Sequence, residues 1–445
     1  MGRRSARSIS ERLEGEPEVG ETYTVTRVER GQAQNSIATV IATKVVSAAE
    51  LRSHRLEKEK LGTNAAGDEQ VNEEESQTLY YIHFENMDRR LDEWVERSRF
   101  QGYGSVDLAA PVSENRPSKM TRSQRRIDEE FNHLSSGIQH LGATSAKLEK
   151  EFEERTKVRN VESIVLGKWE INPWYWSPYP APFDTASRLF ICEFCLSYFK
   201  DLNDYAKHTK FACTSKTPPG KEIYKKGNLR LYEVFGSAQK LYAQSLCLMS
   251  KLFLDHKTLY YDVGTFIFYV LCEADADGSH IVGNFSKETN TGNNLACIMV
   301  LPPYQRKGYG KLLIQISYEL SSREGWIGTP EKPLSDLGKV SYRSYWWWVL
   351  LETLERLDSP QTIRMSIVED EAGIHTDDIF ATLHPVNMTK SWKGEQVVKA
   401  GVRVLEHCRS LGLCRPPSLL LDRKCLHWTP SQIRGPPRKS HKRLV

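Results

Sequence analysis

The sequence predicts a mixed α/β core with an embedded zinc-binding module, a separate small β-barrel before it and a helix-turn-helix-like subdomain after it. Short runs of alternating β-branched and aromatic residues occupy 20–103. A Cys-x2-Cys-x12-His-x4-Cys pattern occupies 192–213. A strand-like run then leads through a glycine loop into a helix-like run at 295–320. Because a strand-like run and a helix-like run follow each other at 295–320, the core is expected to mix strands and helices.

The composition bounds the size and class of the protein. Its 445 residues are enough for two or three domains. The 39% hydrophobic content suits a soluble protein with packed cores, and the 27% charged content suits an exposed surface. The chain has no run of about 18 apolar residues, so no membrane span is expected. A net charge of +4 is too small to indicate nucleic-acid binding by itself.

The amino-terminal residues do not read as a targeting segment. The sequence MGRRSARSISERLEGE lacks the apolar stretch of a secretory signal. Ala6 stands where a myristoylation motif has Ser or Thr, so that modification is not expected. Nine cysteines without a secretory signal favour reduced thiols, and a cysteine cluster then indicates a metal or catalytic site rather than disulfides.

The first predicted domain is β-rich. Strands are expected at 22–28, 36–46 and 78–84, and a turn then leads into 91–100. Their alternation predicts a small twisted sheet or barrel. The charged and polar stretch 48–77 reads as a solvated insertion.

The aromatic residues of this domain have two interpretations. Packing in the barrel core and its hairpins is the favoured one, and stacking on a cation or a nucleobase is the other. The residues concerned are Tyr23, Tyr80, Tyr81 and Trp94.

A linker follows at 104–157. It carries Lys119, Arg122, Arg125 and Arg126 within a short distance. A solvated basic segment is the default interpretation, and contact with a phosphate backbone is the second. Its end, continuing to 160, reads as a polar helix that leads into the core.

The next segment predicts a metal site. Cys192 and Cys195 form a knuckle whose two thiolates can supply two ligands of a tetrahedral Zn²⁺. His208 and Cys213 can supply the other two. Because the module is fused to a larger core, we expect a structural brace whose metal-binding energy serves folding, rather than a reader of nucleic acid.

The glycine loop predicts a pyrophosphate site. Gly308 and Gly310 let backbone N–H groups approach a phosphate closely, with the start of a helix behind them. Arg306, Lys307 and Lys311 add positive charge at the same place. The spacing fits neither GxxxxGK[ST] nor GxGxxG, so it is neither a Walker loop nor a dinucleotide fingerprint.

The remaining chain reads as helical with a basic tail. Helical periodicity at 366–388 is interrupted at Gly373 and restarts at 376–378, which predicts a small helix-turn-helix fold. A DNA-reading role is disfavoured because the second helix is acidic. In the aromatic run 345–348 we expect some side chains in the core and at least one at a groove or partner. The tail 433–445 is basic and reads as disordered, suited to nuclear import or nucleic-acid contact.

Together these segments resemble the catalytic core of the MYST family of histone acetyltransferases. The resemblance covers 158–401 and includes GNFSKE at 283–288, ACIMVLPPYQRKGYGK at 296–311 and TPEKPLSDLG at 329–338. The stretch YYIHFENMDRRLDEWV at 80–95 resembles the chromobarrel of one branch of that family. Barrels of that branch bind nucleosomal partners, nucleic acid or methylated lysine. The expected domains are a chromobarrel at 20–103, the linker at 104–157, the acetyltransferase domain at 158–401 (zinc finger 190–214, acetyl-CoA core 250–346, helical subdomain 347–401) and a C-terminal extension at 402–445.

The resemblance implies acetyl-CoA as cosubstrate and assigns two catalytic candidates. Glu331 matches the family's catalytic glutamate and is expected to act as general base, since a lysine with a pKa near 10.4 must lose its proton before it attacks. Cys297 lies on the strand that the family places beside the thioester. It either accepts the acetyl group first or only shapes the pocket. Direct attack is favoured because no cation adjoins Cys297 in sequence to activate its thiol.

The family also implies individual cofactor contacts. Lys257 matches an auto-acetylated lysine, and its alternative role is an ion pair with Asp255 or Asp262. Ser335 and Ser344 match cofactor-contacting serines, and both also suit helix N-caps. Val300 stands where many relatives have Thr, so only its backbone contact is expected to survive. The expected cofactor-binding residues are Ile298, Met299, Val300, Gln305, Arg306, Lys307, Gly308, Tyr309, Gly310, Lys311, Ser335 and Ser344.

The resemblance implies nuclear acetylation of lysines on core histone tails, with histone four as the expected target, within a chromatin-modifying complex. Two alternatives stay open. The barrel and finger could read chromatin beside a degenerate core, although the intact Cys297, Glu331 and QRKGYG oppose this. A small-molecule N-acetyltransferase would explain the loop but not the zinc knuckle, the PEKPLSDLG segment or the barrel.

Overall fold

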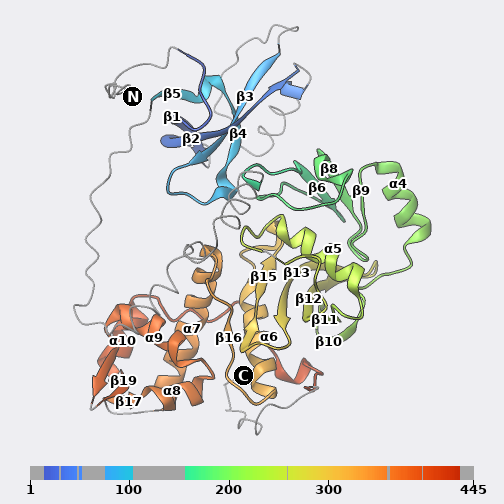
Figure 1. The fold of residues 1–445 in the computed structure, drawn as a ribbon. Coiled ribbons are helices and arrows are strands. Elements are labelled where there is room, and N and C mark those ends of the chain that lie inside the picture. Colours follow the sequence, from blue (N-terminus) through green and yellow to red (C-terminus); the bar gives the residue numbers. More distant parts are fainter. Residues whose placement is uncertain are drawn as a thin grey trace, which may run out of the picture. The chain divides into compact units, whose positions relative to one another are not determined.

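The computed structural model describes residues 15–29, 32–47, 50–52, 76–103, 156–257, 259–357, 361–392 and 394–430 (Figure 1). The chain divides into two compact units. The first comprises 1–114, 147–160 and 174–176, and the second comprises 115–146, 161–173 and 177–445. Residues 104–155 of the predicted linker 104–157, most of the predicted insertion 48–77 and the basic tail lie outside the described residues.

The amino-terminal unit is a barrel-like, five-stranded antiparallel sheet in the order β4-β3-β2-β1-β5. The strands predicted from the alternation at 22–28, 36–46 and 78–84 are confirmed. Two bulges, at Thr24/Val25 and Val40/Ala42, add to the twist that bends such a sheet toward a barrel. The strands are β1 (Thr22–Glu29), β2 (Gln32–Val46), β3 (Gln77–Phe84), β4 (Glu93–Glu96) and β5 (Phe100–Tyr103), with 3-10 turns at Arg89–Leu91 and Arg97–Arg99.

The barrel's aromatic side chains serve mainly as its core. Tyr23, Tyr80 and Tyr81 are each at most 1% exposed. Trp94 is half-buried and packs against Tyr81 at a tilt of 56°, with ring centroids 5.1 Å apart, and the Lys44 ammonium lies 4.8 Å from the centre of its ring. The favoured packing interpretation is thus confirmed for the three tyrosines, whose rings are not accessible to a ligand cation.

A small four-stranded sheet opens the second unit, in the order β7-β6-β8-β9. Its strands are β6 (Ser163–Leu166), β7 (Trp169–Ile171), β8 (Arg188–Ile191) and β9 (Tyr198–Phe199). Helix α4 (Leu202–Lys207) and the short helical turn η5 (His208–Ala212) follow β9. This arrangement presents the β8–β9 turn and the end of α4 toward each other.

A five-stranded antiparallel sheet in the order β10-β11-β12-β13-β15 forms the central part of this unit. Helix α5 (Lys240–Lys251) and helix α6 (Tyr309–Arg323) accompany it. The two helices lie on opposite faces of the sheet, because side chains alternate along β13. Asn284 of β13 donates to Ser250 of α5, whereas Lys287 of β13 forms an ion pair with Glu324 at the end of α6. The strands are β10 (Lys221–Lys226), β11 (Leu229–Phe235), β12 (Phe266–Ala274), β13 (Ser279–Glu288) and β15 (Cys297–Val300).

The helical subdomain confirms the predicted helix-turn-helix and adds a small sheet that the sequence did not suggest. Helices α8 (Met365–Ala372) and α9 (Thr376–Leu383) are separated by Gly373, whose φ of 66° ends α8 in the left-handed conformation. The three-stranded sheet β17-β19-β18 lies beside them. Its strands are β17 (Thr362–Arg364), β18 (Thr389–Trp392) and β19 (Glu395–Lys399).

Helix α7 (Asp336–Arg356) carries the aromatic run through the core of this subdomain. Tyr345, Trp346 and Trp347 are buried, while Trp348 is half-buried and donates from its indole nitrogen to Glu352. The expectation that several of these rings fill the core is confirmed.

The chain beyond Gly401 also packs on the core. Helix α10 (Val402–Ser410) places Leu405 and Cys408 in the helical cluster. Farther on, Gln315 of α6 donates to the Leu419 carbonyl at 2.9 Å, and the Trp428 indole donates to Glu233 of β11 at 2.7 Å. Residues 402–430 thus complete the second unit. Among the described helices, none is both long and apolar enough to span a bilayer.

Candidate active site and metal centre

The four predicted zinc ligands converge. The ligand atoms of Cys192, Cys195, His208 and Cys213 all lie within 4.8 Å of one another. The Sγ atoms of Cys192 and Cys213 are 3.7 Å apart, and Cys195 Sγ lies 3.2 Å from His208 Nε2. A tetrahedral zinc ion bound at about 2.3 Å holds its sulfur ligands roughly 3.8 Å apart. Three thiols and one imidazole at these separations fit Zn²⁺.

Local backbone geometry builds this site. The Cys192 N–H donates to the Ser197 carbonyl, and the Leu196 N–H donates back to Cys192, closing a tight knuckle. Leu196 has a φ of 61°, which this turn requires. His208 follows α4 directly, so the end of the helix places its imidazole beside the knuckle.

The predicted phosphate loop joins β15 to α6. Gly308 is the N-cap of α6 with a φ of 96°, and a Cβ there would lie 2.3 Å from Ser418 Oγ, so only glycine fits. Arg306 also has a positive φ, of 63°. The Gln305 side chain donates to the Val300 carbonyl at 2.9 Å and closes the loop against its own strand. The result is a helix N-terminus flanked by the exposed cations Arg306 and Lys307, an arrangement suited to binding phosphates.

Lys311 lies in a cationic environment that the sequence did not reveal. Burial and then the Arg415 guanidinium lower the pKa of Lys311. Two cations brought this close repel each other unless an anion joins them. Arg415 lies 104 positions after Lys311 in the chain, and no local motif marks it. It belongs with the cofactor candidates.

The two candidate serines have different local roles. Ser335 is the N-cap of α7 and accepts from the Gly338 N–H at 3.1 Å, so its predicted capping role is confirmed. Ser344 lies within α7 rather than at its start, so its capping alternative is wrong. Its hydroxyl lies 2.7 Å from Lys311 Nζ, which places it beside the phosphate loop.

Strand β15 brings Ile298, Met299 and Val300 to the edge of the central sheet. It pairs with β13 through Gly283↔Val300 and Ser286↔Cys297. An edge strand leaves alternate backbone N–H and C=O groups along its outer side for an extended ligand. Alternation turns Cys297 and Met299 toward the α5 side, because they pair with Ser286 and Asn284.

Glu331 reaches this edge through a short parallel pairing. Strand β16 (Thr329–Pro330) pairs with β14 (Asn293–Leu295), and the Glu331 N–H donates to the Leu295 carbonyl at 2.8 Å. The Glu331 side chain remains accessible to solvent. Desolvation of its carboxylate and the neighbouring Glu288 raise the pKa of Glu331, and Lys257 lowers it. The two catalytic candidates are therefore brought to one place.

Lys257 lies among two thiols. Its ammonium interacts electrostatically with the thiols of Cys297 in β15 and Cys247 in α5, and with the Glu331 carboxylate. Burial lowers the pKa of Lys257, but the Cys297 and Cys247 thiols act in the opposite direction and prevail, so the pKa is raised. The expected partners Asp255 and Asp262 are not among the groups that shift it. The sequence thus concealed a cation that lies next to Cys297 in space.

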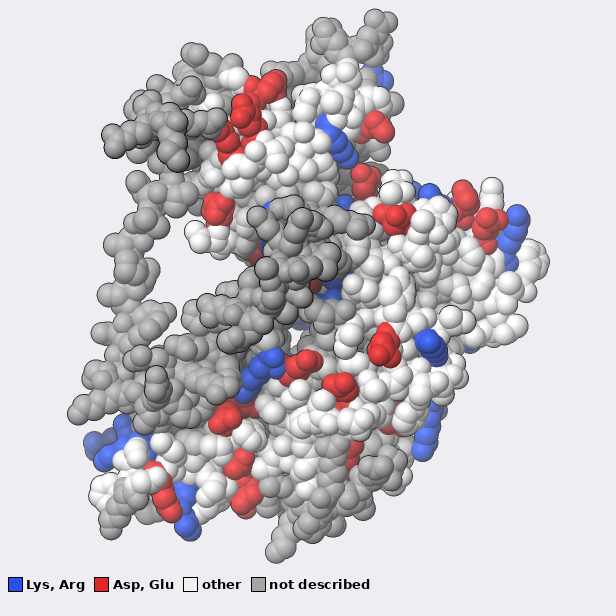
Figure 2. Space-filling model, viewed as in Figure 1, with Lys and Arg blue, Asp and Glu red and all other residues white. Residues whose placement is uncertain are grey.

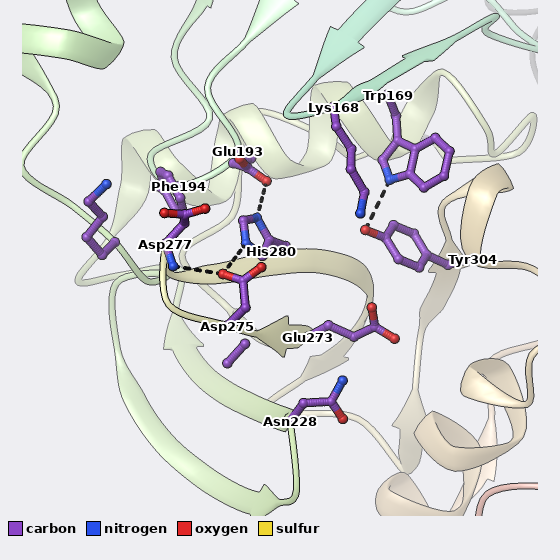
Figure 3. Close-up of a pocket in the computed structure, with 12 residues that line it drawn as sticks. Lys168, Trp169, Glu193, Phe194, Asn228, Glu273, Asp275, Asp277, His280 and Tyr304 are labelled. Carbon is purple, nitrogen blue, oxygen red and sulfur yellow. Dashed lines mark hydrogen bonds and ion pairs between the residues drawn. The ribbon is translucent and has the colours of Figure 1, made fainter.

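A cavity of about 550 Å³ lies elsewhere in this unit (Figure 3). His280 bridges Glu193 at 2.7 Å and Asp275 at 2.9 Å inside it. None of the predicted catalytic or cofactor residues lines this cavity. It is therefore distinct from the site formed by Glu331, Cys297 and the phosphate loop. The lining residues are Lys168, Trp169, Glu193, Phe194, Lys216, Asn228, Glu273, Ala274, Asp275, Asp277, His280 and Tyr304.

Charges are mixed over the visible surface. Figure 2 shows Lys and Arg side chains interspersed with Asp and Glu over the described part of this face. No broad basic field covers the described residues in this view. The described surface seen here does not itself indicate nucleic-acid binding.

Three known families match three successive segments of the chain, which correspond to the segments that its motifs indicate. Residues 217–426 match the MOZ/SAS family, and residues 158–213 match the MYST family zinc finger domain. Residues 20–101 match the Tudor-knot family, described as the RNA binding activity-knot of a chromodomain.

Individual proteins similar to this chain are named as histone acetyltransferases. A putative MYST-like histone acetyltransferase of Oryza sativa subsp. japonica is 47% identical over 361 residues, which covers 80% of this chain and 78% of that protein. The histone acetyltransferase MOF of Drosophila melanogaster is 42% identical over 403 residues, covering 79% of this chain. The chain spans about half of the fly protein's length, 49%. A Tip60 homologue of Caenorhabditis elegans is 39% identical over 353 residues, covering 72% of this chain and 77% of that protein.

Proposed function

Because this chain belongs to the MYST family of histone acetyltransferases, we propose that it transfers acetyl from acetyl-CoA to the ε-amine of lysines in core histone tails, with the tail of histone four as the principal target. Glu331 is the general base, and Cys297 lines the acetyl site. Acetyl-CoA is the cosubstrate that members of this family use.

One observation carries this proposal. The Glu331–Leu295 hydrogen bond brings the base to the edge strand β15, at whose carboxyl end the phosphate loop begins. A thioester laid along β15, with its pyrophosphate on the Gly308–Gly310 amides, would present its carbonyl near Cys297 and Glu331. The same edge thus serves cofactor and chemistry.

Glu331 performs the proton transfer. An ammonium group cannot attack, so the incoming lysine first gives its proton to the Glu331 carboxylate. The free amine then attacks the thioester carbonyl, the tetrahedral intermediate expels the CoA thiolate, and the second proton lost from the new amide nitrogen neutralises that thiolate. Desolvation and Glu288 raise the pKa of Glu331, which makes its carboxylate a stronger base than a solvated glutamate. Backbone N–H groups near Cys297 and Ile298 polarise the carbonyl.

Direct attack remains the favoured route. The Lys257 ammonium is a cation near Cys297 in space, which is the kind of neighbour that the two-step route would need. However, Lys257 itself lies where the acetyl group would stand, and its acetylation would remove that charge. In an enzyme whose Lys257 carries acetyl, that cation is gone, Cys297 only shapes the pocket, and the substrate lysine attacks the thioester in a ternary complex.

Several chain-specific contacts hold the cofactor. Lys311 and Arg415 meet the phosphates as a pair of cations, Ser344 orients Lys311 at 2.7 Å, and Gln305 fixes the loop. Ile298, Met299 and Val300 offer backbone groups to the pantetheine arm. Zinc at Cys192, Cys195, His208 and Cys213 braces the module and takes no part in the transfer.

The setting is nuclear chromatin. Histone tails and nucleosomes are the substrates, and the enzyme works with other subunits of a chromatin-modifying complex. The barrel, the linker and the basic tail supply nucleic-acid contacts. The match of residues 20–101 to a chromodomain-like knot supports this setting.

The test is acetyl transfer from labelled acetyl-CoA to histone octamers, to free tail peptides and to a small primary amine. Labelling of histones, with histone four labelled most and the small amine unlabelled, is expected. Labelling of the amine in preference to histones would favour a small-molecule acetyltransferase. A folded, zinc-loaded protein that labels no histone would contradict the proposal and favour a reader of chromatin.

A further inference from the structure

The carboxylate of Asp378 contacts the chain on both sides of Glu331. Its Oδ2 accepts from Thr329 Oγ1 at 2.7 Å, and its Oδ1 lies 2.9 Å from Lys332 Nζ. One oxygen thus holds the residue two places before Glu331, and the other holds the residue just after it. We propose that Asp378 is a positioning residue, which fixes the place of the Glu331 carboxylate. This inference rests on the proposed role of Glu331 as general base.

Asp378 is completely buried, with a side-chain exposure of 0%, and Lys332 is 21% exposed. It stands in the first turn of α9, among the apolar residues of the helical cluster. The charged and polar side chains that act on its carboxylate are Lys332, Thr329 and His375. The Asp378 charge in turn contributes to the raised pKa of Tyr318 and Tyr342, after their burial. Replacing such a pair by apolar residues is often neutral or stabilising, so its presence points to geometric specificity rather than to stability.

The segment 329–332 is held on two sides. On one side, the β14–β16 pairing and the Glu331–Leu295 bond attach it to the chain entering β15. On the other side, Asp378 attaches it to α9. Without Asp378, the segment would be held on one side alone, by the two-residue strand β16 and the Glu331–Leu295 hydrogen bond. The carboxylate of Glu331 would then sample positions away from the attacking amine.

Such a displacement affects turnover more than cofactor binding. A misplacement of about 1 Å in a reacting group can cost roughly 10²-fold in rate. The phosphate contacts come from α6, α7 and Arg415, and none of them passes through Asp378. Loss of Asp378 should thus lower kcat and leave KM for acetyl-CoA near its wild-type value.

Three variants isolate the positioning effect. Asp378→Asn keeps an oxygen for Thr329 but breaks the ion pair with Lys332. The double variant Asp378→Asn with Lys332→Met also removes the unpaired cation. The matched control is Glu371→Gln, which breaks the 3.2 Å pair with Arg356 in the same subdomain without touching the Glu331 segment.

The measurements are kcat and KM on histone substrate, the melting temperature, and hydrogen–deuterium exchange of the peptide containing the Glu331 amide. In Asp378→Asn, kcat should fall about 10- to 100-fold, with KM for acetyl-CoA changed less than about threefold. Amide exchange at Glu331 should quicken about tenfold. In the double variant, the melting temperature should recover toward wild type while kcat stays low, because the buried unpaired charge is gone but the anchor is not restored. Glu371→Gln should leave kcat and this exchange unchanged.

Wild-type kcat together with wild-type exchange at Glu331 in Asp378→Asn would overturn the inference. Recovery of kcat in parallel with the melting temperature in the double variant would also overturn it, by showing a purely structural role. An inactive wild type would defeat the proposed function instead. The exchange measurement needs no activity, so it would still decide whether Asp378 holds the segment.

Discussion

Glu331 donates its backbone N–H to the carbonyl of Leu295 at 2.8 Å. This hydrogen bond joins two segments 36 positions apart and places the candidate base beside the residues that directly precede β15. Lys257, in the chain after α5, acts electrostatically on both Cys297 and Glu331. The base, the thiol and a cation therefore share one small region, and its chemistry can be tested residue by residue.

Glu331→Gln should lower kcat at pH 7 by about 10²- to 10⁴-fold, because the amide cannot take a proton from the attacking lysine. The rate should recover partly as the pH rises, since more substrate lysine is then already neutral. KM for acetyl-CoA should stay near wild type. Rates measured from pH 6 to 10 test this, and an equal loss at every pH would contradict the role as base.

Glu288→Gln should move the rate profile to lower pH. The base works only when it is deprotonated, so kcat rises with pH through the raised pKa of Glu331. Removing the Glu288 charge takes away one of the causes that raise this pKa, so the rise should begin at lower pH. Profiles of kcat for both proteins check it. Thr289→Val, on the next residue, is the control and should leave the profile unmoved.

Cys297→Ala should keep its rate within about tenfold of wild type, as direct attack requires. Intact-mass measurement after incubation with acetyl-CoA alone should find acetyl on Lys257 and none on Cys297. Loss of all activity in a folded Cys297→Ala protein, together with an acetylated Cys297 in the wild type, would establish the two-step route instead.

Arg415→Ala should raise KM for acetyl-CoA about tenfold, the scale of one lost charge-assisted contact. Acetyl-pantetheine lacks the nucleotide phosphates, so the variant and the wild type should use it equally well. Arg403→Ala, on an exposed position of α10, is a matched control. An equal loss with both thioesters would show that Arg415 supports the fold rather than the phosphates.

Cys213→Ser should lose zinc and lower the melting temperature of the protein, because metal binding and folding of the module are coupled. Elemental analysis should show one zinc per wild-type chain. Cys425→Ser lies outside the cluster and should keep both zinc and stability. A zinc-free variant that melts like wild type would show that the metal is not a brace.

Much of this architecture is predictable because local patterns encode it. The barrel strands follow from their alternation, and the zinc site follows from ligand spacing within 22 residues, 192–213. The helix break at Gly373 follows from its left-handed conformation. Each of these features depends on neighbours in the chain.

What escaped prediction depends on long-range packing. Lys257 meets Cys297 only because α5 and the chain after it fold onto the sheet, 40 positions before that thiol. Arg415 reaches Lys311 because residues 402–430 return to α6. Strands β17, β18 and β19 are three to five residues long, too short for alternation to stand out.

The return of the chain onto the core has a consequence for biosynthesis. Glu233 of β11 accepts a hydrogen bond from the indole of Trp428, which lies 195 positions later in the chain. Arg323 of α6 donates to the carbonyls of Leu426 and Trp428. A nascent chain that has released only the central sheet lacks these contacts, so the core must finish folding after residue 430 leaves the ribosome. Until then, the exposed ends of β11 and α6 are sites where a chaperone can hold the unfinished protein.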